Sequence, residues 1–265
     1  MSGRLPTIFI SHGGPTIVIE DTPARDYLKT LGNRFDRPRA IVIASAHYET
    51  SGPQVVRDPH PGMIYDFGGF PRELYEMVYP APGDPELAAD VGRRLSAAGL
   101  APSFADQRGY DHGTWTPLIL AYPQADIPVV QVSVDPERDP AYHLALGRAL
   151  SGLRDEGILL IGSGHITHNL RAFFMRGRDP ELDRNIVGWT EAFTGWMHDK
   201  LVAGDAPALL DYRRQAPFAR ENHPTDEHLM PLFFAMGAAG ESFSAERTLD
   251  WKQMGFFGYD SYLFH

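Results

Sequence analysis

The chain has 265 residues and a formal net charge of −10, from 34 acidic and 24 basic side chains. This length suits one large domain, and an acidic chain without a Lys/Arg-rich run excludes a nucleic-acid footprint and disfavours anionic membranes. Cysteine is absent, so a metal would need histidine, carboxylate or water ligands. With no apolar run of ~20 residues and no visible signal peptide, we expect a single cytoplasmic domain over residues 1–265 that does not enter a membrane.

Four short, nearly continuous apolar runs predict central β-strands that are covered on both faces. They are Leu5–Ile10, Ala40–Ala46, Ile127–Val134 and Ile158–Gly162. Helices are predicted between or after them, over Pro23–Gly32, Asp84–Ala98, Trp115–Ala121, Pro140–Asp155 and Glu181–Val202. This alternation indicates an α/β fold with a central, mostly parallel or mixed sheet and helices on both of its faces.

Two further segments have less regular patterns. Ser51–Gly69 is rich in proline and glycine, which predicts a long loop, and we expect this loop to form the rim of an active site. The aromatic-rich segment Asp250–His265 is expected to form edge strands that close the fold.

Histidines follow the carboxyl ends of the first two predicted strands. His12 lies in a Ser-His-Gly-Gly-Pro segment, and His47 in a Ser-Ala-His-Tyr-Glu segment. Ligands of open α/β sheets bind at this edge, and neutral imidazole is the commonest metal ligand. Either imidazole could instead only hydrogen-bond its own loop. Two strand ends with the same pattern nevertheless favour a metal site at the carboxyl edge of the sheet.

Two histidines also follow the last predicted strand. His165 and His168 are three residues apart, so both could face the same way if a helical turn begins there. One member of the pair could instead cap a turn or lie on the surface. We expect one of the two to be functional, and favour His168.

The segment His223-Pro-Thr-Asp-Glu-His228 carries helix-start signals, which place His228 in the first turn of a helix that begins near Thr225. Glu227 is an alternative ligand, although a first-turn acid is more often a surface group that complements the helix dipole. His223 precedes a proline and could be exposed in an extended loop.

A last cluster, Tyr110-Asp-His-Gly, places His112 in a loop before a predicted helix, where a surface turn is the simpler interpretation. The remaining histidines lack such a context, and we expect them on the surface or on helix faces. They are His60, His143, His198 and His265.

Taken together and in order, these motifs resemble the DOPA 4,5-dioxygenase-type family of class III extradiol ring-cleavage dioxygenases, which is related to protocatechuate 4,5-dioxygenase. The resemblance covers residues 6 to about 238. The segments that carry it are Ser11–Pro15, Ser45–Thr50, Tyr65–Pro71, Tyr79–Gly83, Asp111–Trp115, His168–Leu170 and Pro224–His228.

The resemblance implies a single α/β domain that holds a metal on His12, His47 and His228. It implies an acid/base role for His168, and a substrate-side role for His112 that includes proton transfer. Fe(II) is the metal implied for activity, and Zn(II) is another ion that such a site can hold. The implied substrates are a small aromatic diol and O2, and the implied product is a muconic semialdehyde.

Three more residues are our candidates for substrate contact. His165 occupies a position where the resemblance leads us to expect asparagine or a small residue, which leaves the identity of the substrate open. His223 and Tyr110 lie beside the implied ligand His228 and the implied catalytic residue His112.

Two other functions stay open. A zinc-dependent hydrolase could use the same three histidines, because zinc lowers the pKa of bound water to about 7. A non-enzymatic metal-binding or partner-binding protein is the second, and two acid/base histidines disfavour it. The ring substituent, the choice between Fe and Zn and the oligomeric state are not determined, and a homo-oligomer is only a base-rate expectation.

Overall fold

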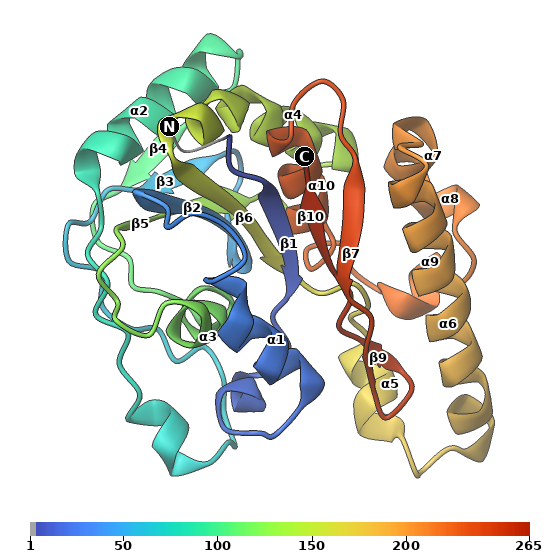
Figure 1. The fold of residues 1–265 in the computed structure, drawn as a ribbon. Helices are drawn as coiled ribbons and strands as arrows, with labels where there is room; N and C mark the ends of the chain where they lie inside the picture. Colours follow the sequence, from blue (N-terminus) through green and yellow to red (C-terminus); the bar gives the residue numbers. More distant parts are fainter. Residues whose placement is uncertain (1–3) are drawn as a thin grey trace.

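The computed structural model describes residues 4–265, and this part of the chain forms one eight-stranded mixed sheet with the order β4-β3-β5-β2-β6-β1-β10-β7 (Figure 1). A separate two-stranded ribbon pairs β8 with β9. The strands are β1 (Thr7–Ser11), β2 (Ala40–Glu49), β3 (Gln54–Val56), β4 (Ser103–Ala105), β5 (Val129–Val134), β6 (Ile158–Gly164), β7 (Ala245–Leu249), β8 (Lys252–Gln253), β9 (Phe257–Gly258) and β10 (Ser261–Phe264).

Helices cover both faces of the sheet, and α6 to α9 form a column of helices on the β7 side of the sheet (Figure 1). They are α1 (Pro23–Leu31), α2 (Pro85–Ala97), α3 (His112–Ala121), α4 (Pro140–Leu150), α5 (Leu170–Met175), α6 (Pro180–Val202), α7 (Ala206–Leu210), α8 (Tyr212–Gln215), α9 (Ala219–Asn222) and α10 (Met230–Ala238), with 3-10 turns η1 (Pro15–Val18), η2 (Arg72–Tyr75) and η3 (Ser151–Glu156). No helix within residues 4–265 is both long and apolar enough to cross a membrane.

Several helices begin with the same local signal, a capping side chain followed by proline. Thr22, Asp84 and Asp139 each accept a backbone N–H of the first turn, and each precedes a proline at the first helical position. The side chain satisfies a backbone donor that the helix leaves free, and proline has no donor to lose there. The capping residue and the proline therefore determine the residue at which each of these helices begins.

The central strands β5, β2, β6 and β1 run parallel to one another, and β5, β6 and β1 are buried along their whole length. Because side chains alternate along a strand, Ile8 and Ile10 share with His12 the face that packs on α1 and α3. The opposite face packs on α4 and α10. The carboxyl ends of β1, β2 and β6 therefore bring their terminal side chains together at one edge.

The four predicted central strands and the mixed α/β architecture are confirmed. The C-terminal prediction is wrong in one respect, because β10 lies inside the sheet, between β1 and β7. The edge strand is β7, which the sequence did not indicate since its residues are mostly polar and only half-buried.

The helix predicted to begin near Thr225 begins later, at Met230. Pro231 accounts for this, because it has no backbone N–H to donate to the carbonyl of Glu227 and is tolerated only at the start of a helix. The carbonyl of His228 is also used elsewhere, since it accepts the backbone N–H of His165 at 2.8 Å. His143 also differs from expectation, since it is fully buried in α4.

The closest approach between the sheet and α10 predicts a stability effect. A Cβ at Gly162 would lie 1.9 Å from the carbonyl oxygen of Pro231. We expect Gly162→Ala to lower the free energy of unfolding by about 1–3 kcal/mol, because the backbones must move apart. The control is Gly188→Ala on the exposed face of α6, where nothing lies within 4 Å of the added Cβ. Urea unfolding of both variants checks this, and equal midpoints would contradict it.

Candidate metal centre

Three imidazoles from distant parts of the chain meet at the carboxyl edge of the sheet. His47 Nε2 lies 3.1 Å from His12 Nε2 and 3.2 Å from His228 Nε2. His12 and His228 are buried, and His47 is partly exposed. Neutral imidazole nitrogens that face one another this closely need a shared proton or cation. Ligands about 2.0–2.1 Å from one ion lie about 2.8–3.4 Å apart at coordination angles of 90–109°, so the donor set fits a metal.

A hydrogen bond at the opposite ring nitrogen of His12 sets which nitrogen is free. His12 Nδ1 lies 3.0 Å from Ser163 Oγ, and that hydroxyl donates to the carbonyl of Gly113 at 2.5 Å. Since the hydroxyl proton is already used, Ser163 accepts the Nδ1 proton of His12. Nε2 of His12 therefore keeps its lone pair.

Asp66 does the same for His47. Its Oδ2 lies 3.3 Å from His47 Nδ1 and 2.9 Å from His112 Nδ1. Its Oδ1 accepts the backbone N–H of His112 at 3.0 Å. Partial burial raises the pKa of Asp66, but the hydrogen bonds and charge of His112 outweigh this effect. The pKa of Asp66 is therefore lowered to about 2. One ionised carboxylate thus orients a candidate ligand and a candidate acid/base residue.

Glu227 plays the matching part for His228. Its Oε1 lies 2.9 Å from His228 Nδ1 and 3.7 Å from His168 Nδ1. The ring of His168 stacks on that of His228, with centroids 3.4 Å apart and planes 11° from parallel. Glu227 is mostly buried, so it is not the surface group that a first-turn acid usually is.

The electrostatics of the cluster keep the imidazoles neutral. Burial, followed by the neighbouring imidazoles, lowers the pKa of His12 and His228 well below the ordinary value. Burial likewise lowers the pKa of His47 to about 4. Neutral imidazole is the form that binds a metal. The three nitrogens bring no charge, and the carboxylates Asp66 and Glu227 can balance a divalent cation.

Two residues that sequence reasoning missed shape the space around His47. A Cβ on Gly113 would lie 2.9 Å from His47 Cδ2 and 3.2 Å from His12 Cε1, so only glycine lets α3 pack against both rings. Arg108 donates to the carbonyl of His47 at 3.2 Å and to Asp111 at 3.1 Å. Its guanidinium also lies over the ring of Tyr48, 3.8 Å from the centroid. These contacts fix the end of β2 against the start of α3.

Of the other sequence candidates, the structure brings His112, His168 and His165 to the cluster. His112 lies against His47 with ring centroids 3.9 Å apart. The ring of His165 lies 6.4 Å from that of His12 and 6.5 Å from that of His168. Burial lowers the pKa of His165 to about 3, so this imidazole is neutral too.

Tyr110 and His223 are not brought to the three histidines. The hydroxyl of Tyr110 donates to the carbonyls of Ala81 and Pro82 at 3.1 and 3.3 Å. His223 is fully buried, and its Nε2 donates to the carbonyl of Ile166 at 2.9 Å. Both contacts support loops behind the cluster, so this geometry gives no support to our expectation of substrate contact.

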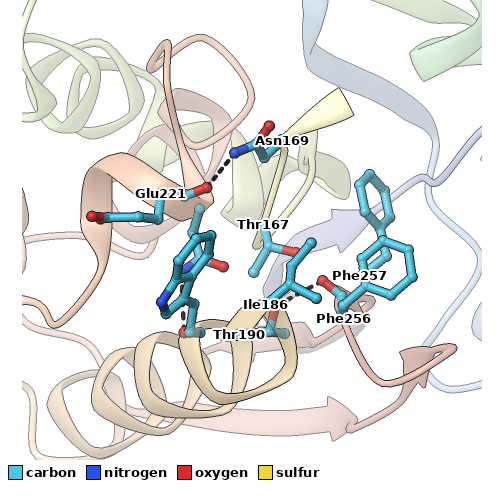
Figure 2. Close-up of a pocket in the computed structure, with 9 residues that line it drawn as sticks. Thr167, Asn169, Ile186, Thr190, Glu221, Phe256 and Phe257 are labelled. Atoms are coloured by element: carbon cyan, nitrogen blue, oxygen red, sulfur yellow. Dashed lines mark hydrogen bonds between the residues drawn. The ribbon is translucent and has the colours of Figure 1, made fainter. Parts of the chain in front are cut away.

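A small cavity lies next to the loop that carries His168 (Figure 2). It is lined in part by Thr167, Asn169 and Phe257, and its volume of about 10 Å³ has room for one water molecule and not for an aromatic diol. Asn169 donates to the carbonyl of Glu221 across its upper side in Figure 2. The cavity therefore lies behind the site and is not the place of the substrate.

Comparisons with known proteins agree with one another. A family model described as the catalytic LigB subunit of aromatic ring-opening dioxygenase matches residues 6–263. A 4,5-DOPA dioxygenase extradiol of Beta vulgaris is 41% identical over 262 residues, covering 97% of this chain and 96% of the relative. The Escherichia coli K12 protein of the same name is 39% identical over 242 residues, covering 89% and 86%. The crystal structure of an uncharacterized Escherichia coli K12 protein is similar with a TM-score of 0.79 and 32% identity, covering 98% of this chain and 99% of the other.

The shared carboxylate predicts a loss of metal affinity on substitution. We expect Asp66→Ala to weaken Zn²⁺ or Co²⁺ binding 10–100-fold, because His47 loses the acceptor that orients its ring. Calorimetric titration of the metal-free protein measures this. The matched control is Asp106→Ala, an exposed carboxylate paired with Arg57, which should bind the metal as the wild type does. Equal affinities for the two variants would contradict the role of Asp66.

Proposed function

The chain belongs to the family of the catalytic LigB subunit of aromatic ring-opening dioxygenases, and we propose that it cleaves a catechol-type diol with O2 at a metal held by His12, His47 and His228. The membership confirms the resemblance seen in the sequence motifs and makes the protein an aromatic ring-opening enzyme. The observation that supports the metal site is the convergence of three Nε2 atoms whose Nδ1 partners leave them free. Extradiol cleavage to a muconic semialdehyde is the outcome that the names of the relatives favour.

Fe(II) is the ion we propose for activity, because reaction of a diol with O2 needs a redox-active metal, and the metal supplies that electron transfer when bound. The chain itself supplies the three neutral donors and the two carboxylates outside them. Zn(II) fits the same imidazoles, but it provides no redox chemistry. A zinc-bound form would therefore be inactive in ring cleavage.

His112 and His168 are the residues we propose for proton transfer. Each lies beside a different candidate ligand, His112 against His47 and His168 against His228. Nδ1 of His112 lies 2.9 Å from Asp66 Oδ2, and Nδ1 of His168 lies 3.7 Å from Glu227 Oε1. We propose that these carboxylates favour a proton on Nδ1 and leave Nε2 available to exchange one. The hydroxyl protons of a diol could thus be accepted on either side, and the same groups can return them as the ring opens.

Anaerobic reconstitution tests the reaction class. The protein loaded with Fe(II) should consume about one O2 for each catechol cleaved and give the yellow colour of a semialdehyde, whereas the Zn(II) form should not. The measurement is oxygen uptake with absorbance over a panel of substituted catechols. Ester or amide hydrolysis by the Zn(II) form without O2, and no uptake by the Fe(II) form, would instead support the hydrolase.

His168→Ala tests the acid/base assignment. We expect kcat to fall by about 10²–10⁴, since the general acid/base is lost while the three ligand candidates remain. Zn²⁺ affinity by calorimetry should change little. His60→Ala, an exposed histidine, is the matched control and should keep wild-type turnover. Retained turnover in His168→Ala would remove this residue from the mechanism.

A further inference from the structure

We propose that His165 binds a polar substituent of the aromatic diol and thereby selects among catechols, an inference that rests on the proposed function. The residue would act as a specificity determinant, apart from the ligand and acid/base positions. Its ligand is a catechol whose side chain ends in a hydrogen-bonding group, such as a hydroxyl or a carboxylate.

The first observation is that His165 is buried without using its polar atoms. Only 1% of the residue is exposed, and neither Nδ1 nor Nε2 has a hydrogen-bond partner within residues 4–265. The backbone of Thr167 lies near the ring, but it does not meet hydrogen-bond geometry. An unsatisfied buried polar atom costs about 1–3 kcal/mol, so this imidazole does not serve the stability of the ligand-free protein through those atoms.

Another buried histidine, His143, shows the hydrogen bonds that a structural imidazole makes. His143 is equally buried, but its Nε2 accepts the N–H of Asp135 at 3.1 Å and its Nδ1 lies 3.0 Å from the carbonyl of Asp139. His143 is thus a fully partnered structural histidine. His165 differs from it in having two free ring nitrogens.

The second observation is the position of His165 beside the cluster. Its backbone N–H donates to the carbonyl of His228, which ties it to the third candidate ligand. Its ring borders those of His12 and His168. A diol bound next to the three Nε2 atoms would therefore have His165 on the flank formed by β1 and the exit loop of β6.

The third observation is the apolar surface that frames this flank. The ring of Phe257 lies 4.3 Å and that of Tyr259 lies 4.8 Å from the ring of His165, both measured between centroids. Phe257 and Tyr259 come from the C-terminal segment around β9, and Phe257 also faces His168 at 6.3 Å. The imidazole is thus the polar group in an otherwise aromatic, buried environment, and mostly apolar surroundings with few polar groups are typical of small-molecule sites.

The test compares substrates that differ only in polarity. They are 4-propylcatechol, 4-(2-hydroxyethyl)catechol and 3,4-dihydroxyphenylacetate, used with the Fe(II)-loaded wild type, His165→Phe and His165→Asn. We expect His165→Phe to lower kcat/KM for at least one polar catechol about tenfold or more, because the hydrogen bond is lost, while 4-propylcatechol changes less than about twofold. His165→Asn, which keeps a donor and an acceptor, should recover part of the difference.

Stability and metal affinity separate this role from a structural one. The Tm of metal-free His165→Phe should fall less than that of His143→Phe, since no side-chain hydrogen bond is broken, and Zn²⁺ affinity should be unchanged. The matched control His143→Phe should lose Tm because it breaks two hydrogen bonds. An equal loss on all three catechols, or a lower Tm without discrimination in both His165 variants, would overturn the proposal.

A failure of the proposed function would give a different result. If the Fe(II)-loaded wild type cleaves none of these catechols, their binding to the Zn(II)-loaded proteins is measured by calorimetry. Selective weakening of the polar catechols in His165→Phe would then still support His165 as a binding residue. Equal affinities in wild type and variant would overturn it.

Discussion

The candidate site depends on one constraint, which is that an oxygen atom lies close to Nδ1 of each of three imidazoles. Ser163 and Glu227 form hydrogen bonds with Nδ1 of His12 and His228, and a carboxylate oxygen of Asp66 lies 3.3 Å from Nδ1 of His47. With the proton on Nδ1, the Nε2 atoms of all three rings are free to bind the same ion. The two carboxylates also hold the charge that a divalent cation would balance, and each of them extends to a further histidine, so orientation of the ligands and placement of the proton-transfer groups are coupled.

The fold produces this arrangement from parallel strands and one close helix packing. β1 and β2 end at the same edge and present His12 and His47 on the same face of the sheet as α3. His228 comes from the other side, in the turn before α10, and the glycines of β6 let α10 approach closely enough for that turn to reach the edge. Side-chain packing and the metal-site geometry are thus satisfied by the same backbone contacts.

Much of this could be predicted from the sequence, because the apolar runs and the strand-end histidines are local signals. The parts that could not be predicted depend on contacts between distant segments. Nothing in the local pattern of Asp66 shows that a loop carries it to both His47 and His112, although it lies in one of the segments on which the family resemblance rests. The sequence pattern also does not show that the carbonyl of His228 pairs with the backbone N–H of His165, 63 positions earlier. Likewise, the sequence predicts an edge strand at β10, whereas in the structure β7 pairs with β10 and forms that edge of the sheet.

The metal site on His12, His47 and His228 is tested most directly by a crystal structure of the Zn²⁺-loaded protein, with anomalous scattering recorded at the zinc edge. The account predicts one strong peak about 2.0–2.1 Å from Nε2 of His12, His47 and His228, with further positions open to small molecules. A peak bound through Nδ1, a peak at other residues, or no peak among these three histidines at saturating zinc would contradict it.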